Sequence, residues 1–318
     1  MDDYKDKSSS LIVFGIFEII GGLLMSFFCL ISLIPMLLPQ SDQAQGQQLF
    51  STLIIYACLA VWLITMGIGT IRGRRWARLL MLAVSWISLG VGAGAMVMIT
   101  FILPKSLQSS MSKEIASVAL IFILGFASLV YLLFPIIGIL FYRGPNVRAT
   151  FEQKDPNVSW TEKCPLPILV LIMMLALVWP TVGTMGAMNF VLPLFGTLVS
   201  GWTGAAVLLV GVGICTSLIP GVYRSRSYAW WSVMILLVLS MLSQLITYSR
   251  IDPMEIYVRA GYSGQMLDLM QKQNWATAKT FSWMALLYGL PVLFYLAVIR
   301  GYFTSGELAE KGGEKNDH

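Results

Sequence analysis

The sequence predicts an all-α, polytopic membrane protein with eight transmembrane helices arranged as two parallel four-helix repeats. Hydrophobic residues make up 57% of the 318 residues and charged residues only 12%. The mean hydropathy is +0.76. Long apolar stretches recur along the chain, with short basic clusters between them. A water-soluble domain carries about 25% charged residues, so lipid is the expected solvent for most of this chain.

Each apolar stretch is long enough to cross the bilayer as a helix. About 20 apolar residues span a hydrocarbon core of roughly 30 Å, and runs this uniformly apolar exclude barrel strands, which alternate in period two. The stretches lie at residues 11–38, 50–71, 77–103, 115–142, 165–192, 202–223, 229–248 and 280–303. The polar start of the chain is expected to be a short tail before an uncleaved span.

The distribution of Lys and Arg predicts the orientation. With a cytoplasmic N-terminus, the inner segments contain 15 of the 21 Lys and Arg residues and the outer segments contain 6. Cytoplasmic connections carry the excess of positive charge in membrane proteins, so both termini are expected in the cytoplasm. Short, separated basic clusters do not form a nucleic-acid footprint, and no nucleic-acid partner is expected.

The chain also contains an internal duplication. "IRGRRWARLLMLAV" at 71–84 aligns without a gap with "YRSRSYAWWSVMIL" at 223–236, and "FPIIGILFYRG" at 134–144 resembles "LPVLFYLAVIRG" at 290–301. Four spans per half give both halves the same orientation, which predicts parallel repeats about an axis along the membrane normal. The expected organisation is a first repeat at 1–142, a cytoplasmic linker at 143–164, a second repeat at 165–303 and a cytoplasmic tail at 304–318.

Two segments of the second half leave their local structure open. Residues 179–202 are rich in glycine and contain Pro180 and Pro193, which indicates either a kinked helix with a tight outer turn or a re-entrant segment; the kink is favoured. The polar segment 249–279 reads as a short amphipathic outer helix that begins at Asp252-Pro253 and is broken at Gly261 and Gly264.

Polar residues inside the spans form the candidate intramembrane site. Glu18 is the one ionisable residue well inside a span, and it is either a proton or cation site or a hydrogen-bonded packing residue. One helical face carries four neutral polar side chains, which either line a polar path or hold neighbouring helices together. These four are Ser240, Ser243, Gln244 and Thr247.

The arginines of the inner connections are candidate lipid-headgroup contacts. They are Arg72, Arg74, Arg75 and Arg78 in the first half, and Arg224 and Arg226 in the second. Their expected role is to hold a tight cytoplasmic turn against anionic headgroups, with binding of a specific lipid headgroup as the alternative. The acidic residues of the linker, Glu152, Asp155 and Glu162, are expected to form a solvated charged face.

No motif for catalysis is found in the sequence. It contains no phosphate-cradling loop, nucleophile elbow or paired carboxylates, its only histidine is His318, and its four cysteines have no paired spacing. We therefore expect no catalytic residue, no metal site and no cofactor, and we do not expect an enzyme.

Two segments of the chain are similar to segments of known membrane proteins. "GIGTIRGRRWARLL" and "FYRGPNVRATFEQKDPNVSWTEKCPLP" resemble segments of uncharacterised bacterial multi-pass inner-membrane proteins, which join a glycine-rich span end, an arginine–tryptophan connection and a further span. The resemblance covers mainly the second and third spans and the central linker. It implies a location in the bacterial cytoplasmic membrane and brings no assigned activity.

Two functions remain from the sequence. The first is an integral membrane protein without a catalytic site that scaffolds or modulates a membrane partner, with 143–164 and 249–279 as contact surfaces. The alternative is a transporter or lipid-handling protein with a path between the two halves. The expected partners are membrane lipids and either another membrane protein or further copies of the chain. The near absence of intramembrane charge argues against ion-coupled transport.

Overall fold

The eight predicted spans are present in the structure. This is a computed structural model, and it describes residues 5–36, 43–110, 112–262, 264, 267–268, 271 and 277–314. Within these residues, the helical segments long and apolar enough to cross a membrane are Ser8–Ile34, Leu49–Ile71, Arg75–Phe101, Lys113–Arg143, Leu166–Gly186, Gly201–Tyr223, Ser227–Arg250 and Ala278–Thr304. The prediction of an all-α polytopic fold is confirmed at this level, whereas the repeat arrangement stays a prediction.

The first half contains four spans and a short surface helix. Its elements are α1 (Ser8–Met36), α2 (Gln43–Ile71), α3 (Arg75–Ser110), α4 (Lys113–Ser128), the π-helical segment η1 (Leu129–Leu133), α5 (Phe134–Arg143) and α6 (Pro145–Lys154). The fourth span is built from α4, η1 and α5 together. Pro135 lacks the N–H that would bond the carbonyl of Tyr131 in a regular helix, which accounts for the altered winding of η1.

The second half contains the remaining four spans and a small hairpin. Its elements are α7 (Leu166–Ala176), α8 (Val178–Gly186), β1 (Leu192–Leu194), β2 (Thr197–Val199), α9 (Gly201–Tyr223), α10 (Ser227–Arg250), α11 (Met254–Arg259) and α13 (Ala278–Glu314). Helix α11 begins after Asp252, whose side chain accepts from the Met254 N–H at 3.0 Å, as the sequence predicts. The predicted continuation beyond Gly261 falls largely outside the described residues.

The fifth span is an interrupted helix followed by an antiparallel hairpin. The interruption lies at Leu177, between α7 and α8. Pro180 accounts for it, because it has no N–H for the Ala176 carbonyl. Strand β1 pairs with β2 from Leu192↔Val199 to Leu194↔Thr197. The favoured kinked helix with an outer turn agrees with this arrangement, although strands this short were not predicted.

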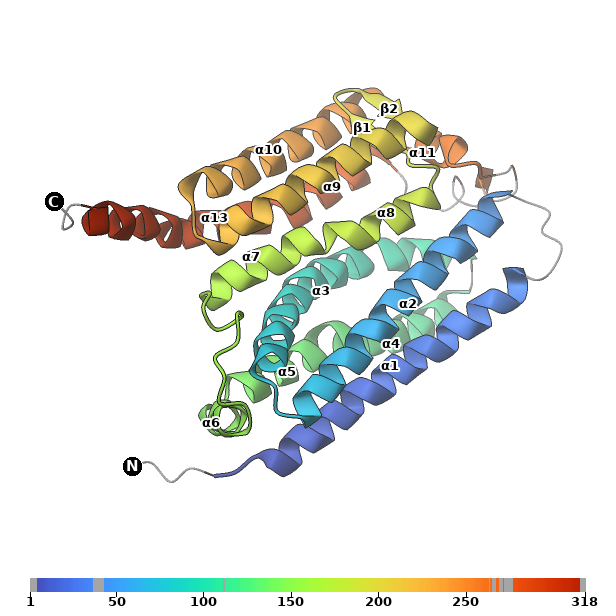
Figure 1. Cartoon of the computed structure of the whole chain (residues 1–318). Helices are drawn as coiled ribbons and strands as arrows, with labels where there is room; N and C mark the ends of the chain where they lie inside the picture. The colour runs from blue at the N-terminus through green and yellow to red at the C-terminus, as the bar shows by residue number, and fades with distance from the viewer. Residues whose placement is uncertain are drawn as a thin grey trace.

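The spans pack as neighbouring pairs within each half, and the halves then meet along a few helices (Figure 1). In the first half α1 packs on α2, and α3 packs on α4, η1 and α5. In the second half α7 and α8 pack on α9, and α10 packs on α13. Contacts between the halves come from α3 with α7, α2 with α8 and α3 with α13. The interface between the halves is therefore centred on α3.

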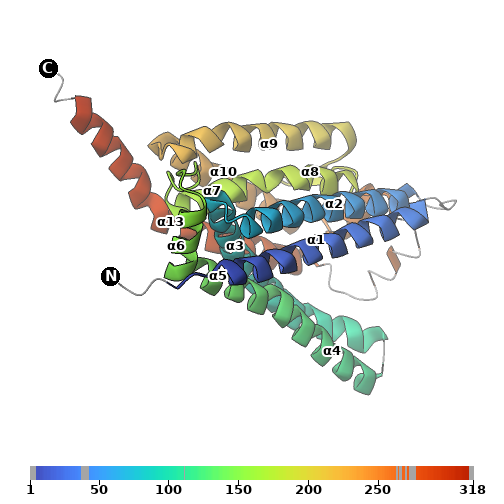
Figure 2. The same ribbon diagram turned by 60° about the horizontal axis from the view of Figure 1, so that its bottom comes forward.

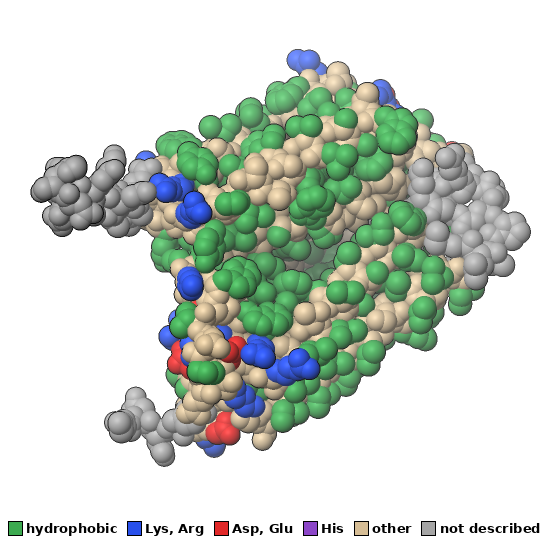
Figure 3. Space-filling view, in the orientation of Figure 1, with side chains coloured by type: hydrophobic (Ala, Val, Ile, Leu, Met, Phe, Trp, Pro, Cys, Tyr) green, Lys and Arg blue, Asp and Glu red, His purple; other side chains and the backbone are tan. Residues whose placement is uncertain are grey.

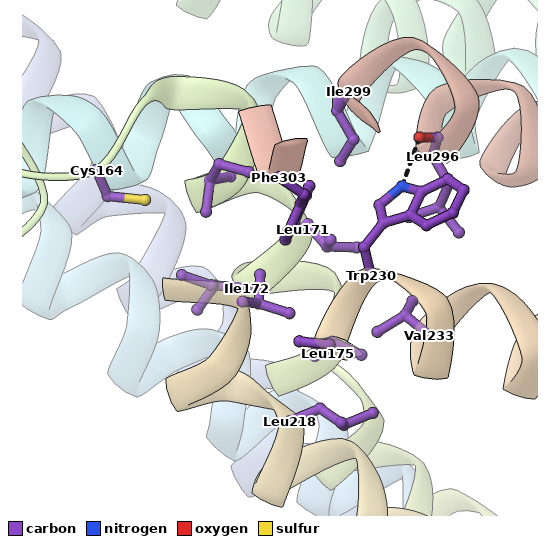
Figure 4. Packing of buried hydrophobic residues seen from close by; sticks show 13 residues of the cluster. Cys164, Leu171, Ile172, Leu175, Leu218, Trp230, Val233, Leu296, Ile299 and Phe303 are labelled. Carbon is purple, nitrogen blue, oxygen red and sulfur yellow. Dashed lines mark hydrogen bonds between the residues drawn. The ribbon is translucent and has the colours of Figure 1, made fainter. Parts of the chain in front are cut away.

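The main core of the second half surrounds Trp230. Its indole Nε1 donates to the Leu296 carbonyl of α13 at 2.9 Å, and Leu171 of α7 lies in the same buried cluster (Figure 4). The bond removes the cost of burying the indole N–H away from water. Helices α7, α10 and α13 are held together through this cluster.

The molecule has two chemically different ends. We call the end that carries both chain termini and α6 the basic end, and the end that carries β1 and β2 the hairpin end (Figure 1). Figure 3 shows Lys and Arg side chains, with some acidic ones, gathered at the basic end, and hydrophobic side chains spread over the helices between the ends. This division fits helices whose middle sections face lipid.

The turns that join α2 to α3 and α9 to α10 have the same backbone hydrogen bonds. In the first turn, the N–H groups of Arg72, Gly73, Arg74 and Ala77 donate to the carbonyls of Ile68, Thr70, Gly69 and Arg74. In the second, those of Arg224, Ser225, Arg226 and Ala229 donate to Pro220, Val222, Gly221 and Arg226. Gly73 and Ser225 both have positive φ, at +64° and +53°. The two turns therefore share one backbone geometry at positions that the sequence alignment makes equivalent.

Candidate functional site

A cleft with a volume of about 680 Å³ lies between the two halves. Helix α3 supplies one wall, α7 and α13 supply the other, and Arg143 at the end of α5 lies at its border. Sites for small molecules have volumes of roughly 300–1,000 Å³, so the cleft is large enough to hold a ligand.

The walls of the cleft are apolar, and the cleft is open to the surface. Leu82 and Val170 are buried in its two walls, whereas Trp86 and Val91 are 43% and 51% exposed. Gly90 lies between Trp86 and Val91 on the α3 wall. A Cβ atom added at Gly90 would meet no atom within 4 Å, so the missing side chain leaves this part of the cleft open.

A single charged side chain, that of Arg143, lies at one end of the apolar walls among the described lining residues. Among the described residues that line the cleft, Arg143 is the only charged one. It is the last residue of α5, at the basic end. The described residues supply no hydrogen bond or ion pair to its guanidinium, and its position at a helix C-terminus is favourable for a cation. An apolar groove that ends in a cation suits an amphiphile with an acidic headgroup.

Glu18 belongs to a separate buried polar cluster in the first half. The Thr70 hydroxyl donates to Glu18 Oε2 at 3.0 Å, the Tyr142 hydroxyl donates to Oε1, and the two hydroxyls lie 3.1 Å apart. All three side chains are at most 9% exposed. The carboxylate is thus hydrogen-bonded across α1, α2 and α5, as the packing interpretation requires. A proton- or cation-binding role for Glu18 stays a prediction.

The neutral members of the predicted polar site lie at the hairpin end. Ser243 Oγ accepts from the Phe195 N–H and donates to the Pro193 carbonyl, both at 3.0 Å. Thr247 Oγ1 accepts from the Gly196 N–H at 3.0 Å. Both residues therefore fasten the β1–β2 hairpin to α10, which explains their burial.

The five residues predicted as one intramembrane polar site are therefore not brought together. Gln244 Nε2 donates to Ser240 Oγ at 3.4 Å within α10 itself, and Ser240 is exposed. Glu18 bonds to residues at the basic end, and none of the five lines the cleft. Any role of Glu18 in binding is separate from that of the α10 face.

Three of the arginines predicted to contact lipid headgroups lie within 4 Å of acidic side chains of the linker. Arg75 contacts Glu162 at 3.0 Å and donates to the backbone carbonyls of Glu152 and Asp155. Arg78 lies 3.5 Å from Glu162 and is buried, and its Nε has no partner among the described atoms. Arg74 lies 3.8 Å from Asp155. These contacts fasten residues 145–164 to the start of α3.

The expectation of a solvated acidic face is wrong for two of its three members. The side chains of Asp155 and Glu162 are 10% and 14% exposed, because the arginines of the α2–α3 turn cover them. Glu152 remains solvated at 36% exposure and pairs with Arg148 at 2.7 Å. The Arg148 hydrogen bond lowers the pKa of Glu152 below its usual range and raises that of Arg148.

Headgroup binding by the remaining arginines stays a prediction. Arg72 and Arg224 are exposed at equivalent positions of the two turns at the basic end. Arg226 is half-buried in the second turn. Arg72, Arg74 and Arg224 are the exposed members of the predicted set.

The structure offers few groups for metal binding or covalent chemistry. Among the described residues, no three His, Cys, Asp or Glu side chains lie close enough together to hold a metal ion. Cys164 is buried, and burial raises the pKa of its thiol to about 11, which suppresses the nucleophilic thiolate. The expectations that no metal or cofactor is needed and that the protein is not an enzyme stay predictions.

The residues of the cleft and the partners of Glu18 are not predictable from the sequence. Leu82, Val170 and Leu287 are ordinary apolar residues of three different spans, and no local pattern sets them apart. Arg143 carried a signal, because "FYRG" ends the first half as "VIRG" ends the second. In the second half, Arg300 lies over the Trp230 and Trp231 rings at 5.5 and 5.8 Å, whereas Arg143 borders the cleft.

The eight apolar helices, and the gathering of charged side chains at the basic end with hydrophobic side chains over the helices, define an integral, multi-pass membrane protein in contact with lipid. Comparisons of the chain with protein-family models, with curated proteins and with solved structures gave no match.

Proposed function

We propose that the protein holds a lipid or a similar amphiphile in the cleft between its two halves. The cleft itself carries this proposal, because it combines apolar walls, an opening to the surface and a volume of about 680 Å³. Of the two functions that the sequence leaves, this is the lipid-handling alternative. It is favoured over transport of a polar substrate because Glu18 and the α10 polar face line no common path.

We place the protein in the bacterial inner membrane with both termini in the cytoplasm. The basic end, with α6 and the two arginine turns, would then face the cytoplasm. The excess of positive charge on cytoplasmic connections supports this orientation. The cleft would open within the cytoplasmic half of the bilayer, with Arg143 at the level of the headgroups.

We also retain the two parallel repeats. The matching hydrogen bonds of the two arginine turns support them, and so does the equivalent pairing of spans in each half. The proposed binding is non-catalytic, since the described cleft lining offers no carboxylate, histidine or cysteine for acid–base or nucleophilic chemistry.

A scaffolding role remains a second candidate, and α4 is the element that favours it. Figure 2 shows α4 leaning away from α1 and α2. Its side chains at Val118, Ile121 and Phe122 are 69–75% exposed. A lipid-exposed helix of this kind can pack against a span of another membrane protein, or of a second copy of the chain.

Gly90→Leu tests the binding function. The new side chain would enter the cleft without meeting any atom within 4 Å of its Cβ, so the helix is expected to remain intact. We expect the fraction of protein that retains lipid in native mass spectrometry, after purification in mild detergent, to fall about tenfold. Helix content, and the melting temperature compared between delipidated samples, should not fall, because leucine is also the better helix former.

Gly125→Leu is the matched control. Gly125 lies on α4, its added Cβ would also meet no atom within 4 Å, and it does not line the cleft. The control should retain lipid like the unmodified protein. Equal lipid retention in the unmodified protein and both variants would contradict the proposed function. A partner protein that co-purifies in stoichiometric amounts, and is lost only when α4 is substituted, would favour the scaffolding role.

A further inference from the structure

We infer that the ligand of the cleft is an anionic phospholipid whose headgroup is bound by Arg143. This inference rests on the proposed function and names the class of ligand. The charge of the cleft lining indicates an anionic ligand, because Arg143 is the only charged residue among the described lining residues. A phosphate that approaches this end of the cleft meets a guanidinium and no carboxylate of the lining.

Four of the other arginines near the basic end of the first half already contact protein groups, and Arg72 lies outside the cleft. Arg75 and Arg78 share Glu162, Arg74 faces Asp155, and Arg148 pairs with Glu152. Arg143 has no acidic partner of this kind among the described residues. Arg143 is exposed, so its guanidinium is accessible to a phosphate, and a hydrogen bond between two charged groups is stronger than one between neutral groups.

The second half provides an internal comparison. Arg300 is the counterpart of Arg143 in the aligned ends of the two halves. It lies 5.5 Å from the Trp230 ring centroid, so its charge is partly satisfied by an aromatic face. Arg143 is the member of the pair that borders the cleft, which predicts a single headgroup site instead of one in each half.

The length of the cleft fits one leaflet. Its α3 wall runs from Leu82 near the basic end to Val91, nine residues farther, which is about 13 Å at 1.5 Å per residue. Half of the hydrocarbon core is roughly 15 Å. A lipid of the leaflet at the basic end can therefore place its acyl chains along α3 and its phosphate at Arg143.

The neutral polar groups of the lining add little headgroup recognition. The Tyr295 hydroxyl, at the α13 wall, already donates to the Pro167 carbonyl at 2.5 Å. Tyr288 lies farther toward the hairpin end on the same helix. Selection should therefore follow headgroup charge and not headgroup shape, so that different acidic phospholipids bind similarly and zwitterionic ones bind more weakly.

Arg143→Gln tests the inference by native mass spectrometry of delipidated protein titrated with phosphatidylglycerol or phosphatidylethanolamine of the same acyl chains. The unmodified protein should prefer phosphatidylglycerol about tenfold. The variant should lose this preference and keep its binding of phosphatidylethanolamine, while Arg143→Lys should retain part of the preference. Arg148→Gln, which removes a solvated arginine outside the cleft that already pairs with Glu152, should leave the preference unchanged.

The outcomes separate the inference from the proposed function. Loss of lipid in Gly90→Leu together with unchanged selectivity in Arg143→Gln would overturn the headgroup assignment and leave lipid binding intact. Full lipid retention in Gly90→Leu would overturn the proposed function itself. Tighter binding of oleate than of phosphatidylglycerol would replace the phospholipid with a fatty acid and overturn this assignment.

Discussion

The position of Glu18 inside a span is visible in the sequence, but its hydrogen-bond partners are not. A carboxylate two turns inside a span is unusual, and this marks it for attention. Its partners could not be predicted, because Thr70 and Tyr142 lie 52 and 124 positions away. The three side chains satisfy one another, and the pairing joins α1, α2 and α5 at the basic end. The depth of Glu18 was predictable, but its hydrogen-bonded environment was not.

Thr70→Val should destabilise the protein through this cluster. Valine has nearly the same shape but cannot donate to Glu18 Oε2, which would leave a buried acceptor with one donor fewer. We expect a loss of about 1–3 kcal/mol in unfolding free energy, seen as a lower melting temperature in detergent. Ser26→Ala is the control, because the Ser26 hydroxyl bonds only the Gly22 carbonyl of its own helix. Equal effects of both substitutions would contradict this assignment.

Glu162 and Glu152, two of the three linker carboxylates that contact arginine, should differ in their contribution to stability. Glu162→Gln removes the anion from Arg75 and the buried Arg78, and we expect a cost of about 3 kcal/mol, as for other broken buried pairs. Glu152→Gln opens a solvated pair and should cost less than about 1 kcal/mol. Thermal unfolding of both variants in one detergent measures the difference, and a larger loss for Glu152→Gln would refute it.

The pH dependence of the Arg148–Glu152 pair has a definite sign. The pKa of Glu152 lies below its ordinary value of 4.5 because Arg148 hydrogen-bonds to its charged form. A depressed carboxyl pKa gives stability that is present above pH 4.5 and is lost as the pH falls through the folded value. The effect should be small, because Glu152 is solvated, and it should be absent from Glu152→Gln.

At the scale of the element, hydropathy located the spans well because lipid imposes one rule on every stretch that crosses it. The exception is the fifth span, predicted to reach residue 192 but ending at Gly186. Its remaining apolar residues enter the turn and the hairpin, which are held by Ser243 and Thr247 of α10. Partners from another span decide such a structure, so a local pattern does not reveal it.

The two arginine turns should respond oppositely to exchange of their central residues. Gly73 and Ser225 both have positive φ, which disfavours residues with a Cβ. Ser225→Gly should therefore raise stability by about 1 kcal/mol. Gly73→Ser should lower it by more, because its Cβ would also meet Lys154 carbon atoms at 2.6 Å. Melting temperatures of the single variants test this, and destabilisation by Ser225→Gly would count against it.

At the scale of the whole molecule, the basic and hairpin ends should lie on opposite sides of the membrane. Gln153 on α6 and Thr197 on β2 are both exposed, so cysteines placed there should react with a membrane-impermeant maleimide. In a background without the native cysteines, Gln153→Cys should label only after the cytoplasmic side is opened, and Thr197→Cys should label in intact cells. Labelling of both from one side would exclude the eight-span topology.

The candidate site was the least predictable part of the molecule. Its walls come from α3, α7 and α13, and its residues are apolar like most of the spans around them. Charge and polarity, which drew attention to Glu18 and to the α10 face, indicated hydrogen bonds that hold helices and the hairpin together. The cleft depends on how the two halves are placed, and this placement follows from packing along the whole length of α3.

The distance along the chain between the two walls of the cleft has a consequence for biosynthesis. Val91 and Leu287 lie 196 positions apart. At about 5–20 residues per second, the ribosome needs roughly 10–40 s to make the chain between them. During this time the α3 wall faces the bilayer without α13. If the spans enter the membrane in chain order, lipid can reach that wall before α13 arrives, and the last span would then displace this lipid or enclose it.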